Sequence, residues 1–305
     1  MRRILIAATG LLVLCTACQP ELIGDPAPDN TNNITTNSDT LLSQLIYLDT
    51  IPGSVADTLS LDVYRYDNQK RTQVVENYTF NGAVRKLAAL ATYYYNGSST
   101  LPYKMTRIHY AWFQPDPDTI HTFFTEYTAQ GKIYSDSSLS KRPGPGAPEQ
   151  VTHINKYQAT GPATLRVNSR YYTPSQPAST YYNDYRFTYF GNTPVQQVNN
   201  FSLSAGTTIS NDSIVVSYDN RVNPVYRAEN LPYPLMADNS GMNELQKNNF
   251  TSVYCRSVTP GTPNVSEYRI LLNYQYNNNG LPVKATINTV LGSYLGNKIV
   301  YIYTQ

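Results

Sequence analysis

The sequence predicts an all-β fold: a long antiparallel β-meander of roughly fifteen strands that forms a large twisted, curled or split sheet. Three observations predict it. Apolar and polar residues alternate with a period of two, turn-forming residues recur about every 14 to 16 residues, and no window from Leu41 to Asn230 shows a sustained helical period. Because neighbouring strands twist by about 20°, so many strands have to curl, close or split into two layers.

The clearest repeating unit runs from Tyr268 to Ile287. Between Tyr268 and Tyr276 every second residue is aromatic or aliphatic, and most of the residues between them are polar. The segment Asn277–Gly280 then supplies residues that tolerate positive φ, and a second alternating stretch follows from Val283 to Leu291. We therefore expect a β-hairpin with about ten residues in each strand.

The other strands are expected between turn signals made of Gly, Pro, Asn and Asp. These signals are Pro52-Gly53, Asp67-Asn68, Asn81-Gly82, Asn96-Gly97, Pro115-Asp116-Pro117, Gln130-Gly131, Pro143-Gly144, Gly161-Pro162, Pro174, Gly191-Asn192, Gly206, Asp219-Asn220, Pro260-Gly261 and Gly292. The rhythm breaks between Asn223 and Phe250, where we expect a long crossover loop with a helical turn at Gly241–Lys247.

The first residues have the pattern of a secretory signal. A basic start, Met1-Arg2-Arg3, precedes an apolar run that is too short to span a bilayer. The following Leu14-Cys15-Thr16-Ala17-Cys18 resembles a bacterial lipobox, which implies a signal peptide at residues 1–17 and acyl chains on Cys18. Residues 18–40 are polar and rich in Pro and Asn, so we expect a lipidated flexible tether that leads to a β-meander repeat domain at residues 41–305.

Charge and cysteine content exclude several classes of protein. The net charge is +2, and removal of Arg2 and Arg3 leaves a neutral chain. A neutral chain lacks the excess of positive charge that nucleic-acid binding requires. After Cys18 the only cysteine is Cys255, so no disulfide framework is available, and Cys255 is expected inside the sheet as a small apolar residue.

Several hairpins share a short motif of tyrosines followed by Asp or Asn. It occurs as Tyr64-Arg65-Tyr66-Asp67, Val216-Ser217-Tyr218-Asp219 and Tyr274-Gln275-Tyr276-Asn277. An Asp or Asn at the start of a turn accepts hydrogen bonds from the backbone two residues on, and the preceding Tyr packs across strands while its hydroxyl reaches water. The motif resembles uncharacterised Bacteroidota envelope lipoproteins with YD-like β-hairpin repeats. That resemblance implies a lipid anchor in the outer membrane of the cell envelope and supplies no catalytic residues.

Motifs of common enzymes are missing from the sequence. It contains no Gly-x-Ser-x-Gly elbow, phosphate-binding loop or dinucleotide fingerprint, so we expect no cofactor and no enzyme activity. His109 and His121 lie in successive predicted strands near Glu126, but their spacing matches no metal motif, and exposed sheet positions are expected for them. Carboxylates scattered over the strands leave a glycan- or lipid-acting hydrolase open.

Aromatic residues are the candidate binding residues, because flat exposed rings suit stacking against a glycan or an envelope protein. The candidates are Tyr94, Tyr103, Trp112, Tyr172 and Tyr182. A second recurring pattern, Asp followed by Thr or Ser and an aliphatic residue, resembles O-glycosylation sites of Bacteroidota. Its acceptors are Thr40, Thr50, Thr58, Thr119 and Ser213.

Taken together, these patterns favour a non-enzymatic envelope lipoprotein, a binding or scaffold module that reaches the membrane through its N-terminal lipid anchor. Three alternatives stay open: the hydrolase, a curled sheet that carries a lipid, and an integral outer-membrane barrel. Charged residues on both faces of many predicted strands and a mean hydropathy of −0.41 disfavour the integral barrel.

Overall fold

The computed structural model describes residues 40–49, 57–110, 117–129, 133–142, 146, 149–161, 164–173, 176–190, 193–203, 208–229, 248–262, 265–291 and 297–304. Within these ranges the chain forms sixteen strands and one helix. They are β1 (Leu41–Asp49), β2 (Asp57–Tyr66), β3 (Thr72–Asn81), β4 (Val84–Tyr95), β5 (Pro102–Tyr110), β6 (Pro117–Tyr127), β7 (Ile133–Lys141), β8 (Gln150–Gly161), β9 (Thr164–Thr173), β10 (Gln176–Phe190), β11 (Thr193–Leu203), β12 (Thr208–Val222), α1 (Pro224–Glu229), β13 (Asn248–Val258), β14 (Val265–Tyr276), β15 (Pro282–Leu291) and β16 (Asn297–Thr304).

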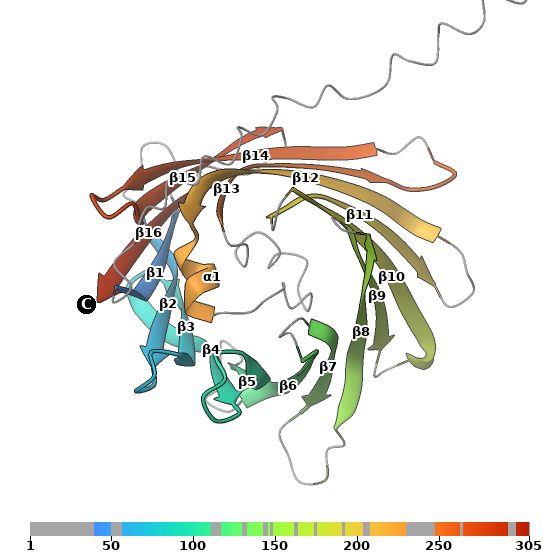
Figure 1. Cartoon of the computed structure of the whole chain (residues 1–305), viewed down its shortest axis with the longest axis horizontal. Coiled ribbons are helices and arrows are strands. Elements are labelled where there is room, and N and C mark those ends of the chain that lie inside the picture. The colour runs from blue at the N-terminus through green and yellow to red at the C-terminus, as the bar shows by residue number, and fades with distance from the viewer. Residues whose placement is uncertain are drawn as a thin grey trace, which may run out of the picture. The chain divides into compact units, whose positions relative to one another are not determined.

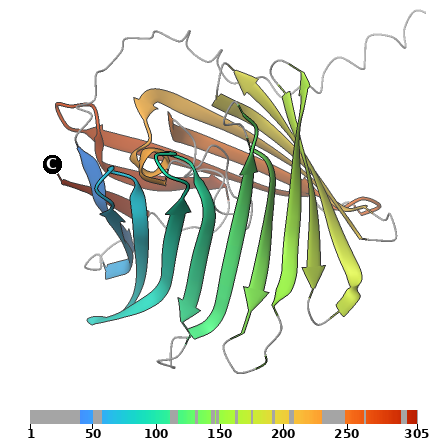
Figure 2. The ribbon, with the colours of Figure 1, turned by 60° about the horizontal axis from the view of Figure 1, so that its bottom comes forward.

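Each strand pairs in antiparallel fashion with the strands that precede and follow it, as in a meander. The first and last strands also pair, with Leu45 opposite Tyr301 and Tyr47 opposite Ile299, so the sixteen strands close into a barrel. Figures 1 and 2 show this succession from blue to red around the ring. The predicted all-β meander is confirmed, and of the three ways in which such a sheet can respond to twist, it has closed.

The predicted hairpin turns are confirmed at two places where the motif of Tyr followed by Asp or Asn occurs, Asp67 and Asn277. The Asp67 carboxylate accepts hydrogen bonds from the backbone N–H of Gln69 at 2.8 Å and of Arg71 at 3.0 Å. At the β14–β15 turn, Asn277 Oδ1 accepts equivalent bonds from Asn279 and Leu281, both at 3.0 Å. These side chains fix the turn because they satisfy backbone donors that the strands cannot pair.

Two predictions about local structure are wrong. No hairpin turn forms at Asp219-Asn220, because β12 continues to Val222, but Asp219 Oδ1 does accept the predicted hydrogen bond from the backbone two residues on, at 2.9 Å from the Arg221 N–H. The helix α1 then follows at once, although no helix was expected before residue 230. Its signal is Asn223-Pro224: Asn223 Oδ1 accepts a 3.0 Å hydrogen bond from the Val225 N–H, as an N-cap does, and Pro224 occupies the first helical position. The predicted helical turn at Gly241–Lys247 lies outside the described residues.

The helix α1 lies against the inner face of the sheet and contributes to its hydrophobic core (Figure 1). Val225 and Ala228 are 5% and 6% exposed and pack among inward-facing side chains, and Thr72 Oγ1 donates a hydrogen bond to the Ala228 carbonyl. The core side chains from the strands are Leu42, Leu45, Tyr64, Val75, Ala91, Tyr93, Met105, Phe123, Ala285, Ile299 and Tyr301. We call the end of the barrel at which β12 meets α1 the helix end.

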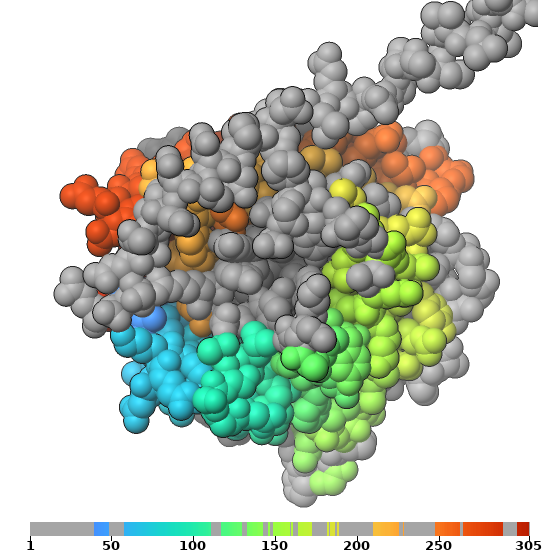
Figure 3. Space-filling model, in the orientation of Figure 1, coloured from blue at the N-terminus to red at the C-terminus, as the bar shows by residue number. Residues whose placement is uncertain are grey.

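Side chains alternate between the core and the outer surface along each strand, as the period of two predicted. In β14, Leu272 is 4% exposed, whereas Asn273 and Gln275 on the opposite face are exposed. The neighbouring strands β2 to β7 form the blue-to-green part of the molecule in Figure 3. None of the helices among the described residues is long and apolar enough to cross a bilayer.

Candidate functional site

Buried polar side chains gather on the inner face of β7, β8 and β9. Strand register aligns Ser138 with His153, and it aligns Asp136 with Asn155 and Asn155 with Ser169. All five are at most 4% exposed. Together with Tyr157, the next inward residue of β8, we call them the inner polar cluster.

Asp136 organises this cluster. Its Oδ1 accepts a 2.8 Å hydrogen bond from Asn155 Nδ2, and its Oδ2 accepts one from the Tyr157 hydroxyl. Burial, followed by the neighbouring Asp136 charge, raises the pKa of Tyr157 well above 10.0, so this phenol stays a donor. The carboxylate therefore fixes the orientation of two side chains on the neighbouring strand.

Ser138, His153 and Asp136 have the composition of a catalytic triad but a different geometry. Ser138 Oγ lies 2.6 Å from His153 Nδ1 and also shares a short contact with Thr152 Oγ1. His153 Nε2 lies 3.3 Å from Asp136 Oδ1 but makes no aligned hydrogen bond. Since Ser138 is 1% exposed and its hydroxyl is held by two neighbours, the arrangement orients His153 and does not present a nucleophile.

A chain of rings extends from the cluster along the inner face. The His153 ring lies 5.9 Å from Phe123 and 6.0 Å from Tyr171, between centroids. Beyond them, the hydroxyls of Tyr171 and Tyr185 lie 3.4 Å apart. Burial raises the pKa of Tyr185 far above 10.0, so this phenol is neutral at pH 7.

The prediction of exposed histidines is wrong, because all three histidines face inward. His109 and His121 are half-buried with ring centroids 5.3 Å apart, and His153 is 4% exposed. Burial, followed by the charges of Arg107 and His153, lowers the pKa of His121 below 6.5, so it is neutral at pH 7. Nowhere in the described ranges do three or more His, Cys, Asp or Glu side chains gather as a metal site would require.

Exposed aromatic side chains form a second candidate site on the outer face of β4 to β7, towards the helix end. Tyr94, Tyr103, Phe124 and Tyr134 are 36–43% exposed. Lys104 lies among them, with its Nζ 5.0 Å from the Tyr94 ring centroid and 5.8 Å from that of Phe124. We call these five residues the outer aromatic patch.

The structure brings together only two of the five predicted aromatic candidates. Tyr94 and Tyr103 belong to the outer aromatic patch, whereas Tyr182 lies on β10, 37% exposed, with the Arg170 guanidinium 5.8 Å from its ring. Tyr172 is half-buried on β9. Trp112 lies outside the described residues, and Phe124 and Tyr134 were not among the candidates.

The structure describes some of the remaining predicted residues and not others. Cys18, the signal peptide, the tether as far as Asp39 and Thr50 lie outside the described residues. Among the other predicted acceptors, Thr40, Thr58, Thr119 and Ser213 are half-buried. Cys255 behaves as predicted: it is a free thiol, 8% exposed on β13, and burial raises its pKa, which makes it unreactive.

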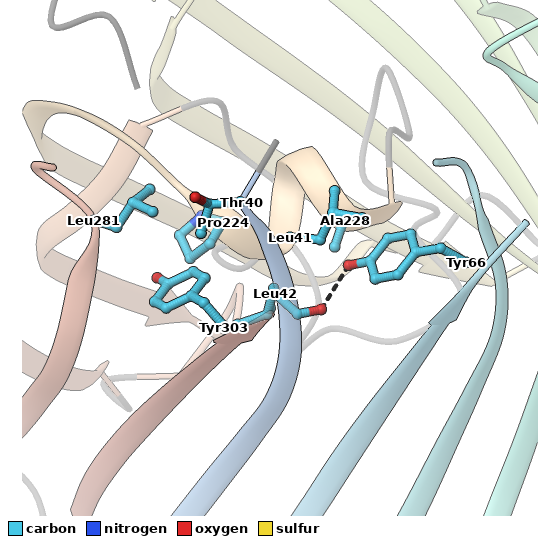
Figure 4. Close-up of a pocket in the computed structure, with 8 residues that line it drawn as sticks. All are labelled: Thr40, Leu41, Leu42, Tyr66, Pro224, Ala228, Leu281 and Tyr303. Atoms are coloured by element: carbon cyan, nitrogen blue, oxygen red, sulfur yellow. Dashed lines mark hydrogen bonds between the residues drawn. The ribbon is translucent and has the colours of Figure 1, made fainter. Parts of the chain in front are cut away.

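A small pocket lies where α1 meets β1 (Figure 4). The side chains that line it are largely apolar, and Tyr66 closes one side by donating a 2.6 Å hydrogen bond to the Leu42 carbonyl. The lining residues are Thr40, Leu41, Leu42, Tyr66, Pro224, Ala228, Leu281 and Tyr303. We regard this pocket as a packing gap at the helix end, because it offers few polar groups to orient a ligand.

The fold and these sites define a class: an up-and-down antiparallel β-barrel with an internal helix and a partly polar interior. No protein-family model matches the chain, and no curated protein matches its sequence. Among solved structures, the chain is similar to a porin-like protein from Bacteroides vulgatus, with 14% identity over 87% of this chain and 99% of that one and a TM-score of 0.51. A porin-like protein from Bacteroides uniformis gives 12% identity, 86% and 96% coverage and a TM-score of 0.39. The first likeness shows a shared fold.

Proposed function

We propose that this protein is a non-enzymatic lipoprotein of the bacterial cell envelope, that acyl chains on Cys18 anchor it to the outer membrane, and that its barrel stands in water and binds glycan through the outer aromatic patch. The observation that carries the binding proposal is the group of exposed rings around Lys104 on neighbouring strands. The name "porin-like" of the similar Bacteroides protein is consistent with an envelope location.

The charges on the outer face of β9 and β10 support a water-facing barrel. Arg166 binds Asp184 through Nε at 2.7 Å and Nη2 at 3.2 Å, and Arg186 Nη2 binds the same carboxylate at 3.0 Å. Three successive outward residues of β9, Arg166, Asn168 and Arg170, are polar. On a lipid-facing strand a single Arg costs about 2–4 kcal/mol at the midplane, so this stretch of the barrel suits water.

The outer aromatic patch has the properties of a glycan-binding surface. Its rings are exposed, lie on rigid paired strands and need little side-chain ordering on binding. Lys104, at the centre of the patch, adds a hydrogen-bond donor for the hydroxyl groups of a sugar ring. The same chemistry suits a membrane interface, where aromatic and basic residues also gather, so the test has to separate the two partners.

The test compares binding of soluble envelope polysaccharide with binding of anionic phospholipid vesicles. We expect Phe124→Ala and Tyr94→Ala each to weaken polysaccharide binding at least tenfold, whereas Tyr182→Ala, on another part of the barrel, changes it little. Binding to vesicles alone would contradict the glycan proposal and make the patch a membrane contact.

The proposal that the protein is not an enzyme is tested separately at Ser138. Ser138 is the hydroxyl nearest to a histidine in the inner polar cluster. A fluorophosphonate probe should leave the protein unlabelled, because Ser138 is buried and held between His153 and Thr152. Covalent labelling at Ser138 that requires His153 would contradict the proposal and favour the hydrolase.

A further inference from the structure

The inner polar cluster contains buried polar atoms that the described residues leave without a partner. Among the described residues, Asn155 Oδ1 and Ser169 Oγ make no hydrogen bond although their residues are 0% and 1% exposed, and His153 Nε2 has only its 3.3 Å approach to Asp136 Oδ1. Most buried polar groups in proteins are paired, so a group of unpaired ones marks a place where a further molecule completes the network.

The orientation of Asn155 is fixed by its neighbour. Its Nδ2 donates a 2.8 Å hydrogen bond to Asp136 Oδ1, and the other oxygen of that carboxyl accepts from the Tyr157 hydroxyl. The unpaired atom is therefore the carbonyl oxygen Oδ1, an acceptor that requires a donor.

Ser169 lies directly opposite Asn155 in the register of β8 and β9, on the same inward face. Its hydroxyl can accept one hydrogen bond and donate another. The two side chains therefore present a pair of neighbouring polar groups that match a ligand hydroxyl, which donates to Asn155 Oδ1 and exchanges a bond with Ser169 Oγ.

Aromatic rings stand beside these polar groups. Tyr171 is inward on β9 two residues beyond Ser169, and the His153 ring lies 6.0 Å from the Tyr171 ring and 5.9 Å from that of Phe123. A few placed hydrogen-bonding groups beside ring faces are the usual composition of a site for a small sugar, because the C–H face of the sugar packs on the ring while its hydroxyls bond to the polar groups.

We propose that the inner polar cluster is a binding site for a small uncharged polyol of the sugar class, enclosed inside the barrel. Asn155 and Ser169 bind ligand hydroxyls, His153 and Tyr171 supply the ring wall, and Asp136 positions Asn155. This site is separate from the outer aromatic patch and goes beyond the proposed function.

The test uses the full chain, incubated overnight with D-glucose, D-galactose or myo-inositol as probes and followed by calorimetric titration and thermal unfolding. We expect at least one probe to bind with a Kd below about 1 mM and to raise Tm, as mass action requires. Ser169→Ala should weaken this binding at least tenfold.

The stability of the protein without a probe distinguishes a binding role of Ser169 from a structural role. Among the described residues the Ser169 hydroxyl has no hydrogen-bond partner to lose, so Ser169→Ala should leave the Tm of the unliganded protein unchanged within error or raise it. Ser217→Ala, at an exposed outward position of β12, is the matched control and should change neither property.

Phe124→Ala on the outer face should leave probe binding unchanged, which distinguishes this site from the proposed glycan surface. Absence of binding by all three probes, or binding that Ser169→Ala leaves intact, would overturn the inference. A lower Tm of unliganded Ser169→Ala, without loss of probe binding, would also overturn it by showing a structural role.

Discussion

The hydroxyl of Tyr66, the last residue of β2, donates a 2.6 Å hydrogen bond to the backbone carbonyl of Leu42 near the start of β1. The same relationship recurs: Tyr95 of β4 bonds to Thr72 at the start of β3 at 2.7 Å, and Tyr127 of β6 bonds to Pro102 at the start of β5 at 2.8 Å. Tyr303 of β16 bonds to Pro282 at the start of β15 at 2.7 Å. These four tyrosines, which lie at or near the ends of even-numbered strands, therefore tie together strand ends at the helix end.

Removal of one such hydroxyl should destabilise the barrel. Tyr66→Phe leaves the ring in place and the Leu42 carbonyl without this partner, so we expect the free energy of unfolding to fall by about 1–2 kcal/mol. Urea denaturation measures the change. Tyr182→Phe, exposed on the outer face of β10, is the control and should cost under about 0.5 kcal/mol. Equal losses in both variants would refute a structural role for the Tyr66 bond.

The N-cap of α1 should contribute measurably to stability. Asn223→Ala removes the acceptor of the Val225 N–H and should cost about 1 kcal/mol, because a buried helix start loses its cap. Thermal unfolding measures this, with Asn220→Ala at a nearby exposed position as the comparison. An unchanged Tm in Asn223→Ala would mean that α1 does not depend on its cap.

Glu76 should make stability depend on acid pH. Hydrogen bonds from Arg65 lower the pKa of Glu76 below 4.5, so its stabilising contribution is complete above the unfolded pKa and is lost as pH falls through the folded one. Between about pH 5 and pH 3 the native chain should therefore lose more stability than Glu76→Gln. Glu149→Gln, at an exposed position, is the control. Parallel curves for native protein and Glu76→Gln would contradict the assignment.

Buried tyrosines should make the barrel sensitive to alkali. Burial raises the pKa of Tyr127 to about 12, so the folded state keeps this proton after the unfolded chain has lost it. Stability should therefore fall as pH rises from about 10 to about 12, and Tyr127→Phe should show a smaller fall. Tyrosinate absorbance during the titration measures the ionisation directly. Release of the Tyr127 proton near pH 10 in the folded protein would exclude this burial effect.

Most of the fold could be predicted because its signals are local. Alternation along Tyr268–Tyr276 and the turn at Asn277–Gly280 depend only on neighbouring residues, and both are confirmed. Closure depends on the contact between β1 and β16, which lie at opposite ends of the domain, and no local pattern carries it. The prediction that motif hydroxyls reach water is wrong at Tyr66 for the same reason, since its acceptor Leu42 lies on another strand.

The candidate sites were less predictable. Exposure of Tyr94 followed from the run Tyr93-Tyr94-Tyr95, whose members cannot all face inward, whereas Tyr103 stands alone between Pro102 and Lys104. The inner polar cluster was not predicted, because His153, Asn155 and Tyr157 are polar and no local pattern in β8 marks their side as the inner one. Their place inside follows only from pairing with Ser138 and Asp136 on the neighbouring strand.

The central claim, a lipid-anchored barrel that stands in water, is tested most directly by a spin label at Asn168→Cys on β9. Cys255 is buried and should stay unlabelled. In the acylated protein on lipid vesicles, we predict that a water-soluble paramagnetic reagent broadens the label signal strongly, while oxygen has the weak effect it has in water. Strong oxygen broadening with exclusion of the water-soluble reagent would place this face in lipid and contradict the account.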